Sequence, residues 1–108
     1  MIKSRHPAHR LLPVLLCLAI LAAIPAQAET GDVAAPPIAG RCVACHGADG
    51  IGKAPQYPNL QGQKAAYLEK QIKAFRSGER NDPWMSAMAK SLTDEEIAAL
   101  ASWFAALR

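Results

Sequence analysis

Cys42-Val43-Ala44-Cys45-His46 is the segment around which the rest of this chain must fold. Its C-x-x-C-H spacing is the one that attaches a c-type haem. Two intervening residues let one turn of backbone present both thiols to one edge of the ring, where each can form a thioether bond to a vinyl group. The adjacent His46 can then give its imidazole to the iron. The motif therefore predicts a covalently bound haem.

Two other kinds of site use closely spaced cysteines. A zinc site needs about four protein ligands, and residues 29–108 offer only two cysteines and one histidine, so carboxylates would have to complete it. A thioredoxin-like dithiol belongs in a strand-then-helix context, and no strand pattern precedes Cys42. We favour haem, with zinc and a redox dithiol as the alternatives.

The first 28 residues have the layout of a secretory signal peptide. A basic start with Lys3, Arg5 and Arg10 precedes an apolar run over residues 11–24, which ends at Pro25-Ala26-Gln27-Ala28. This A-x-A pattern predicts cleavage after Ala28 and export to the periplasm. The apolar run is shorter than the roughly 20 residues of a spanning helix, so an uncleaved anchor is the weaker alternative. We predict a signal peptide over residues 1–28 and one domain over residues 29–108.

Removal of the signal changes the charge of the protein. Three of the 12 lysines and arginines precede residue 29, whereas all nine acidic residues lie at or after it. Residues 29–108 therefore carry no formal net charge, and the basic balance of the whole chain gives no support for a nucleic-acid partner. We expect the mature form to be soluble.

The remaining sequence predicts an all-α domain of three to four helices. A short helix should run from about residue 37 into the motif, after Pro36 and Pro37. Glycines and prolines mark residues 47–62 as a loop. A helix over about residues 63–77 should end at Gly78. We expect a loop over residues 79–91. The last helix should begin at a capping box formed by Thr93 and Glu96.

The helix over residues 63–77 has two contrasting faces. The apolar face is predicted to contain Tyr67, Leu68, Gln71, Ile72 and Phe75. The opposite face carries a basic row of Lys70, Lys73, Arg76 and Arg80, which is first of all a solvated surface and otherwise a docking patch for an acidic partner. In the last helix the predicted core stripe is Ile97, Leu100, Ala101, Phe104 and Leu107, with Trp103 on its flank.

A haem attached at this motif needs a second axial ligand. His46 is the only histidine after residue 28, which nearly excludes ligation by two histidines. Thioether sulfur is the usual alternative, and it raises the reduction potential. Met85 and Met88 are the only methionines of residues 29–108, so both are candidates.

Over residues 38–108 the chain resembles the class I cytochromes c, especially small soluble bacterial monohaem carriers and the single-haem halves of bacterial dihaem carriers. The segments that carry the resemblance are Cys42-Val43-Ala44-Cys45-His46-Gly47-Ala48-Asp49-Gly50, Pro58-Asn59-Leu60-Gln61-Gly62-Gln63, Met85-Ser86-Ala87-Met88, Leu92-Thr93-Asp94-Glu95-Glu96-Ile97 and Trp103-Phe104. It implies a small all-α cytochrome c fold wrapped around one covalent haem c.

The resemblance also implies a role for individual residues. Cys42 and Cys45 would form the thioethers, and His46 would be the proximal ligand. Met85 occupies the position of the distal ligand and is preferred over Met88. Ligand type and position together imply a high-potential haem.

Two further residues match positions that support the haem in this family. The carbonyl of Pro58 would accept a hydrogen bond from the other imidazole nitrogen, which would fix the ring; alternatively, Pro58 is only a turn residue. Leu60 would pack on the haem. The sequence departs from the family at Pro36-Pro37, which shortens the N-terminal helix, and in the short segment before Met85.

These features predict an electron-transfer protein rather than an enzyme, with no small-molecule substrate. The protein would be a periplasmic one-electron carrier with a His46/Met85-ligated haem, shuttling electrons between respiratory complexes through transient contacts with redox proteins. An alternative is a haem c electron-transfer subunit of a specific periplasmic dehydrogenase or oxidase complex. A ligand sensor or peroxidatic site would require Met85 to be weak or displaced.

Overall fold

The computed structural model describes residues 32–108, so the predicted signal peptide and the start of the predicted domain lie outside the described residues. The elements follow the chain as η1 (Pro37–Ala39), α1 (Gly40–His46), α2 (Ala65–Ser77), α3 (Met85–Ala89) and α4 (Asp94–Ala106). No strand occurs within residues 32–108. The all-α prediction is confirmed, although one helix occurs where the sequence predicted a loop.

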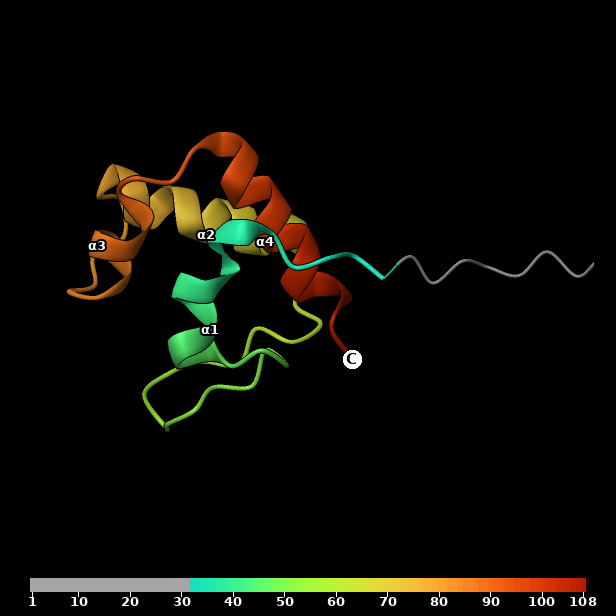
Figure 1. Ribbon diagram of the computed structural model, residues 1–108. Helices are drawn as coiled ribbons and strands as arrows, with labels where there is room; N and C mark the ends of the chain where they lie inside the picture. The colour runs from blue at the N-terminus through green and yellow to red at the C-terminus, as the bar shows by residue number, and fades with distance from the viewer. Residues whose placement is uncertain (1–31) are drawn as a thin grey trace, which may run out of the picture.

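Helix α2 packs against both α3 and α4, and η1 packs against α4. Helix α1 extends away from this group toward the long loop over residues 47–62, with α3 and α4 on its two sides (Figure 1). The buried core comes mainly from α2 and α4 and consists of Ala39, Leu68, Phe75, Ala89, Leu92, Ile97, Leu100, Ala101, Trp103 and Phe104. Among the described residues no helix combines the length and apolarity needed to cross a bilayer.

Helix α4 begins as its sequence predicts. The Thr93 hydroxyl accepts a hydrogen bond from the Glu96 amide, and the Glu96 side chain accepts one from the Thr93 amide. Three acidic residues in the first turn also suit the positive end of the helix dipole. The capping box therefore fixes the register in which Ile97 and Leu100 point into the core.

Replacing Thr93 with Ala should lower the free energy of unfolding by about 1 kcal/mol, because it removes the hydroxyl that caps α4. The Thr93→Ser variant keeps a hydroxyl, so its free energy of unfolding should fall much less. Urea denaturation followed by far-UV circular dichroism measures both. Equal stability of the Ala variant and the parent protein would show that the cap contributes nothing.

Helix α2 starts two residues later than predicted, at Ala65, and ends at Gly78, whose φ of +84° is the left-handed conformation that favours glycine. Leu68 and Phe75 are buried as predicted. Tyr67 is 49% exposed, so its assignment to the buried face is wrong. The third buried residue of this helix is instead Ala74.

The N-terminal and C-terminal segments meet despite the two prolines. Pro37 opens a 3-10 turn, and Ala39 at its end is 4% exposed in the core. Trp103, predicted on the flank of the last helix, is in fact buried, and its ring lies 4.6 Å from that of Phe104. Within residues 32–108, a short turn and a large aromatic side chain therefore close this side of the core.

Candidate functional site

One short helix presents the three residues of the motif. Cys42, Cys45 and His46 all belong to α1, and both cysteines are half-buried free thiols. Burial raises the pKa of the Cys42 thiol above its ordinary value, while the neighbouring Arg41 guanidinium acts in the opposite direction. Both sulfurs are thus placed by the same turn and a half of helix that carries the imidazole.

His46 is held in a fixed orientation. Its side chain is only 6% exposed, and its Nδ1 lies 2.8 Å from the Pro58 carbonyl oxygen. Because that oxygen can only accept, Nδ1 is the donor of this bond, and in the neutral imidazole the lone pair is then on Nε2, where a metal could bind. The imidazole also meets the Phe104 ring edge-on at 6.4 Å. The expected contact between His46 and Pro58 is present.

The loop between α1 and α2 is folded so that Pro58 returns to His46. The Gly50 carbonyl accepts hydrogen bonds from the Leu60 and Gln61 amides, at 2.7 and 3.0 Å. The Asn59 side chain accepts one from the Gly52 amide at 2.8 Å. Leu60, predicted to pack on the haem, is partly buried against the core. The loop is therefore a support for the imidazole as well as a connection.

Replacing Gly47 with Ala should disturb this loop more than the same change at Gly78. Both glycines have a positive φ, near +82° and +84°, but only Gly78 lies in the left-handed region, which costs an alanine about 1–2 kcal/mol. Gly47 has a ψ of 148°, a backbone conformation open essentially to glycine alone, so its variant carries more backbone strain. A Cβ at Gly47 would also clash with the Ile51 carbonyl oxygen, whereas one at Gly78 meets nothing within 4 Å.

The extra loss at Gly47 should be about 1–3 kcal/mol, the usual cost of overpacking. Urea denaturation of the two variants provides the comparison. If Gly47→Ala loses no more stability than Gly78→Ala, the close approach in this loop does not constrain the fold.

Met85 lies in a helix, although the sequence predicted a loop over residues 79–91. The Asp82 side chain accepts hydrogen bonds from the Trp84 and Met85 amides, at 2.9 and 2.8 Å, and the Ser86 hydroxyl accepts one from the Asp82 amide. Asp82 therefore holds the turn that leads into α3, whose N-cap position is Trp84. An Asp followed by Pro83 is a helix-start signal that could have revealed this element.

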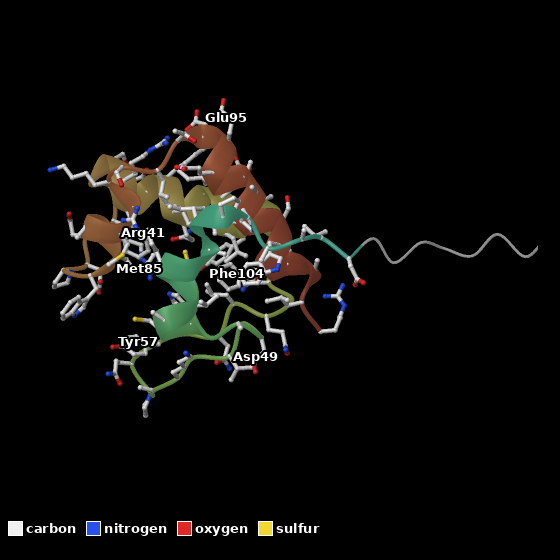
Figure 2. The ribbon with its side chains drawn as sticks, in the orientation of Figure 1. Arg41, Asp49, Tyr57, Met85, Glu95 and Phe104 are labelled. Carbon is white, nitrogen blue, oxygen red and sulfur yellow. The ribbon has the colours of Figure 1, made fainter. Side chains whose placement is uncertain are left out.

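The two methionines of α3 are placed differently. Met85 is half-buried and packs against the core, whereas Met88 is 41% exposed. Figure 2 shows Met85 on the side of α3 that looks toward α1. This arrangement agrees with the preference for Met85 over Met88 as a ligand.

The side chains gathered at this site bear on the choice between a haem and a zinc ion. Within residues 32–108 no three His, Cys, Asp or Glu side chains gather as a metal site would require, so a zinc site is not supported. Two thiols on one helix, an imidazole with a free Nε2 and a core-facing thioether instead fit a haem. The fold and this site define a class of protein: small all-α domains built around one c-type haem.

The chain belongs to the cytochrome c family, since the family model "Cytochrome c" matches residues 34–108. It is 56% identical over 68 residues to cytochrome c-554(548) of Halomonas halodenitrificans, covering 60% of this chain and 82% of that relative. It is 42% identical over 95 residues to the thiosulfate dehydrogenase electron acceptor of Thiomonas intermedia, covering 87% of this chain and 44% of the relative.

The fold is also similar to that of a solved relative. The crystal structure of reduced recombinant cytochrome c4 from Pseudomonas stutzeri matches with a TM-score of 0.58 and 38% identity, over 62% of this chain and 38% of that one. This chain therefore spans less than half the length of two of the three relatives described. The class I resemblance and the small cytochrome c fold are confirmed.

Membership of this family establishes the cofactor and the kind of activity. The protein is an electron-transfer protein and not an enzyme, and its cofactor is haem c, joined through the cysteines of the C-x-x-C-H motif.

Most side chains of the predicted basic row interact with other residues of the fold. Lys73 pairs with Glu69 at 2.6 Å. Arg76 turns toward α4, where it donates to the Leu92 carbonyl at 2.9 Å. The Arg80 guanidinium lies 4.5 Å from the centre of the Phe75 ring and donates to the Gln71 side chain. Three of the four charges of this row are therefore held by partners within the fold.

Arg76 also pairs with Asp94, at 2.6 Å, at the start of α4. The guanidinium lowers the pKa of the Asp94 carboxyl below its ordinary value. The pair therefore stabilises the fold fully only above the ordinary pKa of an aspartate, and this stabilisation is lost as the pH falls through the lowered pKa. The contribution is modest, because Asp94 is exposed.

Proposed function

We propose that this protein is a periplasmic one-electron carrier whose haem iron is ligated by His46 and Met85. The observation that carries the proposal is the orientation of His46, whose Nδ1 bond to Pro58 leaves Nε2 as the free donor. Met85 supplies the complementary donor, because α3 holds its side chain against the core. Haem c, when bound, supplies the Fe(III)/Fe(II) couple.

The two ligands have separate tasks. The Pro58 carbonyl fixes the His46 ring and raises the basicity of the imidazole. The Met85 thioether favours the ferrous state and so raises the reduction potential. Ligation by both side chains leaves no open position for oxygen or peroxide. Such a site suits electron transfer and not bond-making chemistry.

The location and partners rest on different observations. The signal-like residues 1–28 support export to the periplasm. A relative named a thiosulfate dehydrogenase electron acceptor supports a role in receiving electrons from another redox protein. We propose transient contacts with such partners and a shuttle between respiratory complexes. A haem c subunit of one periplasmic dehydrogenase or oxidase complex is the second candidate, favoured by the same relative.

Two experiments test this proposal. The haem-loaded protein, reduced and exposed to CO, should show almost no spectral change, because Met85 occupies the site; rapid CO binding would contradict ligation by Met85. Gel filtration of a native periplasmic extract should place the haem absorbance at the size of the free chain. Co-elution with a stoichiometric partner would favour the subunit role, and haem absorbance confined to the cytoplasmic fraction would contradict export.

A further inference from the structure

Arg41 is an unusual neighbour for the haem-attachment motif. It immediately precedes Cys42, yet its side chain reaches across to the segment that carries Met85. One guanidinium nitrogen lies 3.2 Å from the Met88 carbonyl oxygen and 4.0 Å from the Met88 sulfur, and the other lies 3.3 Å from the Ser91 hydroxyl. Figure 2 shows that Arg41 comes from α1, and its bond to Met88 reaches the helix that also carries Met85.

These contacts are the direct hydrogen bonds between α1 and the α3 segment within residues 32–108, and all of them come from Arg41. Helix α3 has only five residues and otherwise packs on α2. A helix of this length has little stability of its own. The position of α3 relative to α1 therefore depends on a few tertiary contacts, of which Arg41 supplies those to the motif helix.

We propose that Arg41 is a positioning residue that latches α3 to the haem-attachment helix and thereby keeps Met85 on the iron. The inference rests on the proposed ligation by Met85 and deepens it. Its hydrogen bonds involve neither His46 nor Met85, nor the sulfurs of Cys42 and Cys45. It acts through the backbone at Met88, three residues after Met85.

The Arg41 hydrogen bonds stabilise only the arrangement in which α3 lies against α1. For another ligand to replace Met85, α3 must move away from α1, and the Arg41 contacts must break. A net contribution of the size usual for hydrogen bonds corresponds to a factor of about three to ten in this equilibrium. Loss of the latch should therefore raise the apparent affinity for a competing ligand by about threefold to tenfold.

Imidazole titration of the ferric, haem-loaded protein measures this affinity from the change in the absorption spectrum. Arg41→Ala should bind imidazole about threefold to tenfold more tightly than the parent. Arg41→Lys keeps the charge but loses the planar set of guanidinium donors, so its imidazole affinity should lie between those of the parent and of Arg41→Ala. Met88→Leu should change little, because the carbonyl and not the sulfur is the nearer partner. Ser91→Ala, which removes one acceptor, should give a partial effect.

A matched control separates the latch from general stability. Thr93→Ala weakens the fold through α4 without touching Arg41 or α3, so it should leave imidazole affinity unchanged. If Thr93→Ala and Arg41→Ala raise the affinity equally, Arg41 has only a structural role. If Arg41→Ala matches the parent, the latch does not exist.

Amide hydrogen exchange gives a second measurement. In Arg41→Ala the amides of α3 should exchange about threefold to tenfold faster, while those of α4 should keep the parent rate. Unchanged exchange in α3 would overturn the proposal even if the variant loads haem poorly. If the parent protein binds imidazole without displacing a thioether, the proposed ligation by Met85 is wrong. If the parent resists imidazole and Arg41→Ala resists it equally, only the proposed role of Arg41 is wrong.

Discussion

Replacing Met85 with Ala should lower the reduction potential strongly and open the iron to external ligands. Loss of the thioether removes the ligand that favours the ferrous state. Axial ligands set haem potentials over a range of about 0.8 V, and the fall should be a substantial part of that range. A redox titration followed by absorption spectra measures the potential, and CO added to the ferrous variant reports the open position.

Met88 provides the matched control for this variant. It lies on the same short helix but is 41% exposed, and its carbonyl rather than its sulfur is the closer contact of Arg41. Met88→Ala should therefore keep the potential and the resistance to CO of the parent protein. An unchanged spectrum and potential in Met85→Ala would mean that Met85 is not the ligand, and the reverse pattern would assign this role to Met88.

Replacing both Cys42 and Cys45 with Ala should abolish covalent haem and leave a chain that does not fold stably. The core is small, and Ile97 and Leu100 are the largest fully buried side chains among the described residues. A domain of this size buries only about 60% of the surface that its unfolded chain exposes. Haem staining after denaturing electrophoresis and far-UV circular dichroism provide the two measurements.

The single cysteine variants are the controls for the double variant. Cys42→Ala and Cys45→Ala each keep one thiol on α1, so each should retain haem in a denaturing gel in reduced yield. A double variant that still carries haem through denaturing electrophoresis would show attachment elsewhere. A double variant with a full helical signal and a cooperative transition would show that the protein folds without the haem.

Local signals in the sequence were sufficient for much of the fold. The capping box at Thr93 and the glycine at position 78 are decided within a few residues, and both appear as predicted. The C-x-x-C-H motif places two thiols and an imidazole on one helix for the same reason. The pairing of His46 with Pro58 spans only a loop, and it came from the family resemblance rather than from the spacing itself.

Other features depend on contacts that no local pattern records. Tyr67 and Trp103 were each assigned to the wrong environment, because the packing of α2 on α4, rather than helical periodicity, decides which side chain is covered. Helical periodicity predicts that the basic row lies on one face of α2, yet Arg76 turns toward Asp94, 18 residues further along the chain. No local sequence pattern indicates the role of Arg41, because its hydrogen-bond partners lie 47 and 50 residues further along the chain.

Helix α3 was missed for a different reason. Asp82-Pro83 predicts a turn, and a turn is present at Pro83 and Trp84, but the chain then continues directly into a helix instead of a loop. Only five helical residues follow, too few for a periodic pattern. The difference matters for the proposed ligand, because the backbone amide of Met85 is held by a hydrogen bond to Asp82 at the start of a helix and does not lie in a loop.

The most direct measurement of the central claim is a redox titration of the haem-loaded protein with spectra recorded at each potential. Ligation by His46 and Met85 predicts one reversible one-electron transition at high potential, a six-coordinate spectrum in both states and thioether ligation in the ferric state. A five-coordinate ferrous spectrum, or a low-potential transition without thioether ligation in the ferric state, would contradict the account.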